Sequence, residues 1–108
     1  MNPEDILNIF DVILKEHSPS ITSISFSYNP YFGDEGVIIF VKNLPLSIQK
    51  IGLVDCGLSN KGGSALLKWI KQAPNLKMIC IEQNNFSQKL KAEFHMFAKD
   101  NPNILLVI

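Results

Sequence analysis

The chain has 108 residues, of which 46% are hydrophobic, and its ten lysines balance ten acidic residues in the absence of any arginine. This length and composition indicate about one globular domain. A neutral surface without arginine argues against a nucleic-acid or anionic-membrane partner, and no apolar run approaches the roughly 20 residues that cross a bilayer.

The first predicted element is a helix within residues 1–20. Asn2 is a candidate N-cap, Pro3 suits the first helical position, and acidic residues follow in the first turn. Its apolar stripe comprises Ile6, Ile9, Phe10 and Ile13. We expect this helix to cap one end of the fold.

The strongest pattern is a strand motif that recurs along the chain. The copies are Ile21-x-x-Ile24-x-Phe26-x-x-Asn29, Ile48-x-x-Ile51-x-Leu53-x-x-Cys56, Leu76-x-x-Ile79-x-Ile81-x-x-Asn84 and a truncated Ile104-x-x-Val107. They begin 27, 28 and 28 residues apart. The chain therefore divides into a helical segment, three repeats and a final strand, with the bounds 1–20, 21–47, 48–75, 76–103 and 104–108.

The middle repeat predicts the structure of each unit. Alternate apolar residues of the strand point inward, and Cys56, at the usual Asn position, satisfies backbone groups in the following turn. Residues 60–63 then supply turn chemistry, and Leu66, Leu67 and Ile70 form a helical apolar stripe. The sequence therefore predicts an α/β fold of stacked strand–turn–helix units with parallel strands.

At these motifs the chain resembles leucine-rich-repeat proteins of the ribonuclease-inhibitor-like subclass. The resemblance implies a short solenoid, a right-handed αβ superhelix with strands on the concave face and helices on the convex face. It also implies binding of another protein, sometimes an enzyme that is inhibited. Small bacterial members of that family include effectors delivered into host cells, and a composition rich in Ile, Asn and Lys is compatible with that origin.

A second resemblance concerns the segment from Pro3 to Phe10, which is similar to the opening helix of an F-box. It suggests an alternative function as a ubiquitin-ligase substrate adaptor. An F-box has further helices, whereas the first repeat strand here begins at Ile21. A plain end-cap is therefore the favoured interpretation.

The outward strand positions and the turns that follow them form the predicted docking surface. Parallel strands bring equivalent positions of successive repeats into rows. Tyr31 is included in this surface because it is inserted beside aromatic neighbours, and aromatic side chains often anchor interfaces. Phe32 is left out because it fits a core position of the repeat. The predicted partner-binding residues are Ser25, Ser27, Tyr28, Tyr31, Lys50, Val54, Asp55, Met78, Cys80, Glu82 and Gln83.

The apolar run Ile104–Ile108 ends the predicted sheet at an open edge. Native proteins usually cover or blunt such edges. Closure of the core is the favoured explanation. Pairing of this strand with another chain, as in an edge-strand dimer, is the alternative.

The leading functional hypothesis is a non-enzymatic protein-interaction module that binds, and inhibits or modulates, a partner such as an enzyme whose active site it covers. Catalysis by the neighbouring acids Asp55 and Glu82 is a remote alternative, because a solvated pair is far commoner. We expect no cofactor and no metal. The acidic N-terminus lacks a signal-peptide pattern, and Cys56 and Cys80 look like reduced thiols, so a cytoplasmic location is expected, with delivery into a host cell as an extension.

Overall fold

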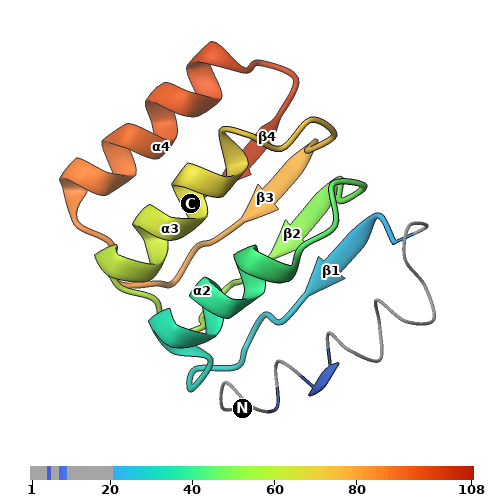
Figure 1. Ribbon diagram of the computed structural model, residues 1–108. Helices are drawn as coiled ribbons and strands as arrows, with labels where there is room; N and C mark the ends of the chain where they lie inside the picture. The colour runs from blue at the N-terminus through green and yellow to red at the C-terminus, as the bar shows by residue number, and fades with distance from the viewer. Residues whose placement is uncertain (1–4, 6–7, 10–20) are drawn as a thin grey trace.

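The computed structural model describes Asp5, Asn8, Ile9 and residues 21–108 (Figure 1). Four short strands alternate with three helices in this part of the chain. The elements are β1 (Ser23–Ser25), α2 (Gly33–Asn43), β2 (Lys50–Gly52), α3 (Asn60–Ile70), β3 (Met78–Cys80), α4 (Gln88–Asp100) and β4 (Leu105–Val107). The rest of the predicted capping helix lies outside the described residues. No helix in the described part is long and apolar enough to cross a membrane.

The strands form one parallel sheet in the order β1-β2-β3-β4, and the three helices lie side by side on one face of it (Figure 1). Ile24 pairs with Ile51, and Ile51 pairs with Ile79. These are equivalent positions of the repeated motif, so the motif alignment of the first three strands is confirmed. The predicted α/β class with parallel strands is confirmed with it.

The register of the last strand differs from the prediction by one residue. Ile79 pairs with Leu106 instead of Val107, and Cys80 pairs with Val107. Ile104, Leu106 and Ile108 therefore pack against the core, whereas Leu105 is exposed. The motif could not detect this shift, because every residue from 104 to 108 is apolar and the alternation of polar and apolar residues that specifies register is missing.

The core lies between the sheet and the helices. Its residues come from the inward strand positions, the following turns and the inner helix faces. In the first repeat, the rings of Phe26 and Phe32 stack with centroids 5.2 Å apart, and both meet Phe40 edge-on. Phe32 is 2% exposed, so its assignment to the core is confirmed.

The turns after the strands are held by side chains that satisfy buried backbone groups. Asn84 Oδ1 accepts hydrogen bonds from the N–H groups of Cys56 (3.0 Å) and Leu58 (3.1 Å). Its Nδ2 donates to the carbonyl oxygens of Leu53 (2.8 Å) and Ile81 (3.0 Å). Asn84 thus ties its own turn to the preceding repeat.

Cys56 has the corresponding role one repeat earlier. Its Sγ donates to the carbonyl oxygen of Phe26 at 3.1 Å, and the residue is completely buried. Burial raises the pKa of this thiol and the Asp55 charge adds to the increase, although N–H groups of Asn29 and Tyr28 oppose it. The predicted structural role of Cys56 is confirmed.

Asp34, in the first turn of α2, caps the start of the next helix. Its Oδ1 accepts from the N–H groups of Ser59 (2.8 Å) and Gly62 (2.9 Å), and its Oδ2 accepts from the Ser59 hydroxyl. A carboxylate at the N-terminus of α3 is favoured by the helix dipole as well as by these bonds. Each of these contacts links one repeat to the next.

This cap should make stability dependent on acid pH. Burial alone would raise the pKa of Asp34, but the hydrogen bonds from Ser59 and Gly62 and the charge of Lys61 bring it below its ordinary value of 3.8. A lowered folded-state pKa stabilises the fold above the unfolded-state pKa, and this contribution is lost as the pH falls through the folded-state value. Urea unfolding at about pH 7 and about pH 3 should therefore show a cost of Asp34→Asn that shrinks in acid. A cost independent of pH would contradict this role of the charge.

Candidate functional site

The face of the sheet opposite the helices carries the predicted docking surface. The observed register places outward positions in two rows. The first is Ser23, Lys50, Met78 and Leu105, and the second is Ser25, Gly52, Cys80 and Val107. The sheet face therefore changes from polar at β1 to apolar at β3 and β4. Four of the predicted contact residues, Ser25, Lys50, Met78 and Cys80, lie on it.

The final strand contributes other residues than the alignment predicted. The predicted motif Ile104-x-x-Val107 aligns Val107 with Ile79 and so would place Leu106 and Ile108 on the outer face, but both residues pack against the core. Leu105, which is 56% exposed, and Val107 take their places. This correction follows from the one-residue register shift, which moves each side chain to the opposite face of the sheet.

Ser25 and Ser27 form a small hydroxyl cluster over Gly52. Ser25 Oγ donates to Ser27 Oγ at 3.2 Å, and Ser27 Oγ accepts from the Val54 N–H at 3.0 Å. A side chain at position 52 would collide with this cluster, because a Cβ there would lie 2.8 Å from Ser25 Oγ. The absence of a side chain at Gly52 leaves room for Ser25 and Ser27 above it, and the hydroxyls of these two serines are hydrogen-bonded to each other.

Val54 was predicted to be a contact residue, but it is only 9% exposed. The strict alternation of inward and outward side chains holds for the strand, which ends at Gly52. Leu53 and Val54 follow in the turn, and both are buried. Val54 is therefore buried and does not belong to the exposed surface that a partner could contact.

Tyr28, Asp55 and Gln83 occupy one repeat position with an unusual backbone. Their φ angles are +66°, +51° and +62°, in the left-handed region that non-glycine residues seldom adopt. The backbone of the first two is held by hydrogen bonds: the Tyr28 N–H donates to the Val54 carbonyl oxygen (2.7 Å), and the Asp55 N–H donates to the Glu82 carbonyl oxygen (3.1 Å). The structure thus places these three predicted residues in a row, just beyond the carboxyl ends of β1, β2 and β3.

The turn after β1 presents two exposed aromatic side chains. Tyr28 is 68% exposed and Tyr31 is 85% exposed. The turn itself is anchored, because Phe32 is buried and its N–H donates to the Asn29 carbonyl oxygen at 2.9 Å. The sequence suggested this aromatic cluster, but the turn geometry decides which of its rings face solvent.

Cys80 and Glu82 are half-buried neighbours at the end of β3. Burial raises the pKa of the Cys80 thiol above its ordinary value of 9.0, and the Glu82 carboxylate raises it further. A thiol in this environment stays protonated near neutral pH, which fits the predicted role as a contact residue instead of a nucleophile. Glu82 Oε1 is buried and has no hydrogen-bond partner among the described residues.

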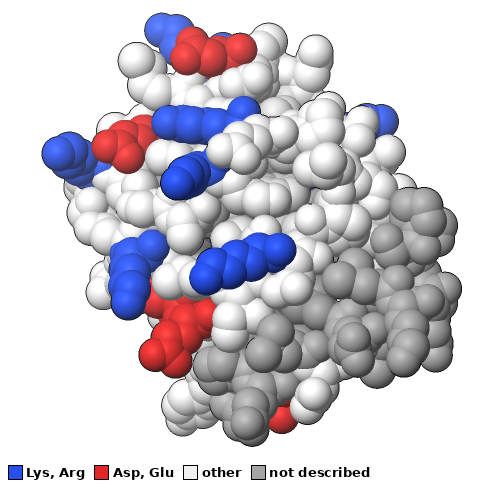
Figure 2. Space-filling view, viewed as in Figure 1, with Lys and Arg blue, Asp and Glu red and all other residues white. Residues whose placement is uncertain are grey.

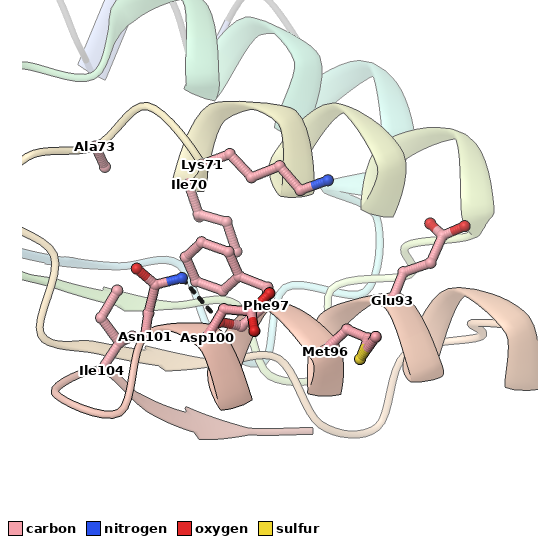
Figure 3. A pocket seen from close by; sticks show the side chains of 9 residues that line it. All are labelled: Ile70, Lys71, Ala73, Glu93, Met96, Phe97, Asp100, Asn101 and Ile104. Carbon is pink, nitrogen blue, oxygen red and sulfur yellow. Dashed lines mark hydrogen bonds between the residues drawn. The ribbon is translucent and has the colours of Figure 1, made fainter.

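A pocket of about 400 Å³ lies between the ends of α3 and α4, and no sequence pattern predicts it (Figure 3). Its lining residues are Ile70, Lys71, Ala73, Glu93, Met96, Phe97, Asp100, Asn101 and Ile104. The Asn101 side chain donates to the Phe97 carbonyl oxygen at 2.8 Å and fixes one wall. Since the walls carry both signs of charge, this pocket has no clear preference for one kind of ligand.

Within the described residues, no group of three or more His, Cys, Asp or Glu side chains is arranged to hold a metal ion. The segment Pro3–Phe10 lies outside the described part of the chain except for Asp5, Asn8 and Ile9. The F-box alternative and the expected absence of catalysis and cofactors therefore remain predictions.

Comparison with known proteins gives a similarity of fold. The C-terminal domain of tropomodulin from Caenorhabditis elegans superposes with a TM-score of 0.77 at 16% sequence identity. The match covers 95% of this chain, which spans 62% of the length of that domain. No family model matches the sequence, and no curated protein matches it.

These comparisons overturn the predicted family. The resemblance to ribonuclease-inhibitor-like leucine-rich-repeat proteins, and the bacterial-effector origin drawn from it, are wrong as a family assignment: no family model supports them, and a tropomodulin domain is among the structural neighbours. The strand spacing indicated how one unit packs on the next. Proteins that share such packing at 16% identity share a fold, and the fold alone implies no common function.

Proposed function

We propose that this protein binds a partner protein through the outer face of its sheet and the turns that follow the strands. The observation that carries the proposal is the pair Tyr28 and Tyr31, both largely exposed on an anchored turn beside that face. Tyrosine buries a large area at a low cost in conformational entropy, and aromatic side chains anchor many interfaces.

The dimensions of the sheet explain why the turns are needed. Four strands span about 14 Å across, and three residues span about 10 Å along a strand. A standard interface takes about 800 Å² from each partner. The area of the strand face is smaller than a standard interface. Tyr28, Asp55 and Gln83, just beyond the carboxyl ends of the strands, would extend that area.

The repeated units support a more specific architecture. Equivalent residues of successive strands are paired in parallel, and the helices occupy one layer beside the sheet. We propose a short solenoid whose strand face is concave, since helices are wider than strands and spread the outer layer. Such a shape suits a convex partner surface.

The narrower proposal is that the partner is an enzyme whose active site is covered by this surface. The mixed character of the face supports recognition of one defined surface, with hydroxyls at β1, Lys50 in the centre and apolar side chains at β4. An enzyme partner would lose activity in proportion to the fraction bound. Activity unchanged in the saturated complex would reject inhibition and leave binding intact.

The tyrosine pair provides the test. The double variant Tyr28→Asn/Tyr31→Ala should raise the Kd for the captured partner by about thirtyfold, equivalent to about 2 kcal/mol. Asparagine is chosen at position 28 because it tolerates the positive φ of that residue. The measurement is affinity capture from cell extract, followed by calorimetric titration of the purified partner.

Leu46→Ala/Met96→Ala is the matched control. These side chains are 64% and 62% exposed. Leu46 lies in the loop between α2 and β2 and Met96 lies in α4, whereas the two tyrosines lie in the turn after β1. The control should capture the same partner with an unchanged Kd. A partner that is retained equally by the wild-type protein and both double variants would refute the proposed site.

A further inference from the structure

A second surface feature lies on the helix side, away from the strand face. A groove of about 280 Å³ runs between α2 and α3. Its lining includes the apolar residues Ile38, Val41, Ala65 and Trp69 and the lysines Lys42 and Lys68. Val41 and Trp69 pack partly against the core, so the floor of the groove is fixed by the fold.

The groove is positively charged. Lys42 and Lys68 lie in the last turns of α2 and α3, and α3 contains no acidic residue. The acidic residues of α2, Asp34 and Glu35, are in its first turn. Figure 2 shows lysine side chains across the helix side of the molecule, with acidic side chains toward the periphery of the view. The lining of the groove therefore has cationic groups and no carboxylate.

The size and shape of the groove indicate the class of ligand. Its volume is slightly below the ~300–1,000 Å³ of common small-molecule pockets. A shallow apolar groove between two helices suits the side chains of an amphipathic segment, which docks through residues spaced by three or four. Trp69 is half-buried within the groove, whereas membrane insertion would need a protruding apolar side chain.

We infer that this groove binds an amphipathic acidic segment of a partner protein. Leucine-sized side chains of that segment contact Ile38, Val41 and Trp69, and its carboxylates pair with Lys42 and Lys68. The inference is independent of the proposed strand-face function, because the two surfaces lie on opposite sides of the sheet.

The tryptophan makes the inference directly testable, since Trp69 is the single tryptophan of the sequence. The probe is a synthetic peptide with leucines at helical spacing flanked by glutamates. Titration into the wild-type chain should shift the Trp69 emission to the blue in a saturable manner. A peptide with the same leucines and lysines in place of glutamates should bind at least about tenfold more weakly.

Charge-reversal variants and a salt titration test whether the acidic peptide binds in this groove. Lys42→Glu/Lys68→Glu should weaken binding of the acidic peptide about tenfold, and raising NaCl from about 20 mM to about 300 mM should weaken binding to the wild-type chain. Lys77→Glu/Lys99→Glu makes the same change in net charge at exposed residues outside the groove and should leave the Kd within about twofold. Circular dichroism checks that each variant folds, and the salt titration needs no variant.

Three results would overturn the inference. The first is no emission shift with the acidic peptide up to about 1 mM, an affinity too weak for a specific site. The second is equal binding of both peptides. The third is an emission shift produced by vesicles of anionic lipid but by neither peptide, which would assign the groove to a membrane surface.

Discussion

Replacing Asn84 by alanine is expected to lower the free energy of unfolding by about 3 kcal/mol, a large share of the roughly 5–15 kcal/mol that stabilises a typical domain. The side-chain amide of Asn84 makes four hydrogen bonds of 2.8–3.1 Å to backbone groups of two successive repeats. Alanine would leave the N–H groups of Cys56 and Leu58 without their acceptor. These residues are buried, so water cannot easily replace the lost bonds.

The preceding repeat provides an intermediate variant. Cys56 occupies the same position there, and its thiol donates to the Phe26 carbonyl oxygen. Asn84→Cys would keep a donor near the Leu53 carbonyl oxygen but would weaken the acceptor for the two N–H groups. Its cost should therefore be smaller than that of alanine, about 1–2 kcal/mol.

Urea unfolding followed by circular dichroism measures both effects. Asn85→Ala is the control, because Asn85 is the exposed neighbour and uses its backbone N–H, not its side chain, to bond the Leu58 carbonyl oxygen. Its free energy of unfolding should stay within about 0.5 kcal/mol of wild type. If Asn84→Ala were as stable as Asn85→Ala, the linkage between repeats would not depend on this amide.

The second large effect is expected at Gly57, where alanine should cost about 3 kcal/mol or more. Gly57 has a φ of +68°, and a Cβ at this position would lie 2.2 Å from the Pro30 carbonyl oxygen. Neither atom belongs to a flexible side chain, so relief of the clash requires movement of two adjacent turns. Those turns carry Tyr28, Tyr31 and Asp55, so partner binding should weaken as well.

Gly33 gives an unusually close control for this substitution. It has the same φ of +68°, but nothing lies within 4 Å of its Cβ position. Gly33→Ala should therefore cost only the conformational penalty, about 1 kcal/mol. The difference between the two variants in urea unfolding isolates the contact with Pro30. Equal costs would show that backbone strain alone accounts for the requirement for glycine at position 57.

The two candidate surfaces differ in how directly the sequence predicts them. Ser25, Lys50, Met78 and Cys80 lie on the strand face as expected, because a period of two residues determines which side chains share a face. The groove beside Trp69 was not expected. Its walls come from two helices, and nothing in the spacing of either helix specifies the space between them.

Several errors have a common physical cause. The register of β4 was misassigned because residues 104–108 are all apolar, and Val54 was misplaced because alternation does not extend beyond the strand. The family was misassigned for a related reason. Apolar residues at a 27- or 28-residue spacing describe the packing of a unit, and that packing is compatible with more than one family.

The sequence by itself determined the α/β class, the alignment of the first three strands and the structural role of Cys56. Each of these depends on local periodicity or on a turn within one unit. Only the tertiary structure decided the register of the last strand, the exposure of Tyr28 and Tyr31, the bridging role of Asn84 and the groove between α2 and α3. These features arise where one unit meets the next, and contacts between units depend on distances that no single repeat encodes.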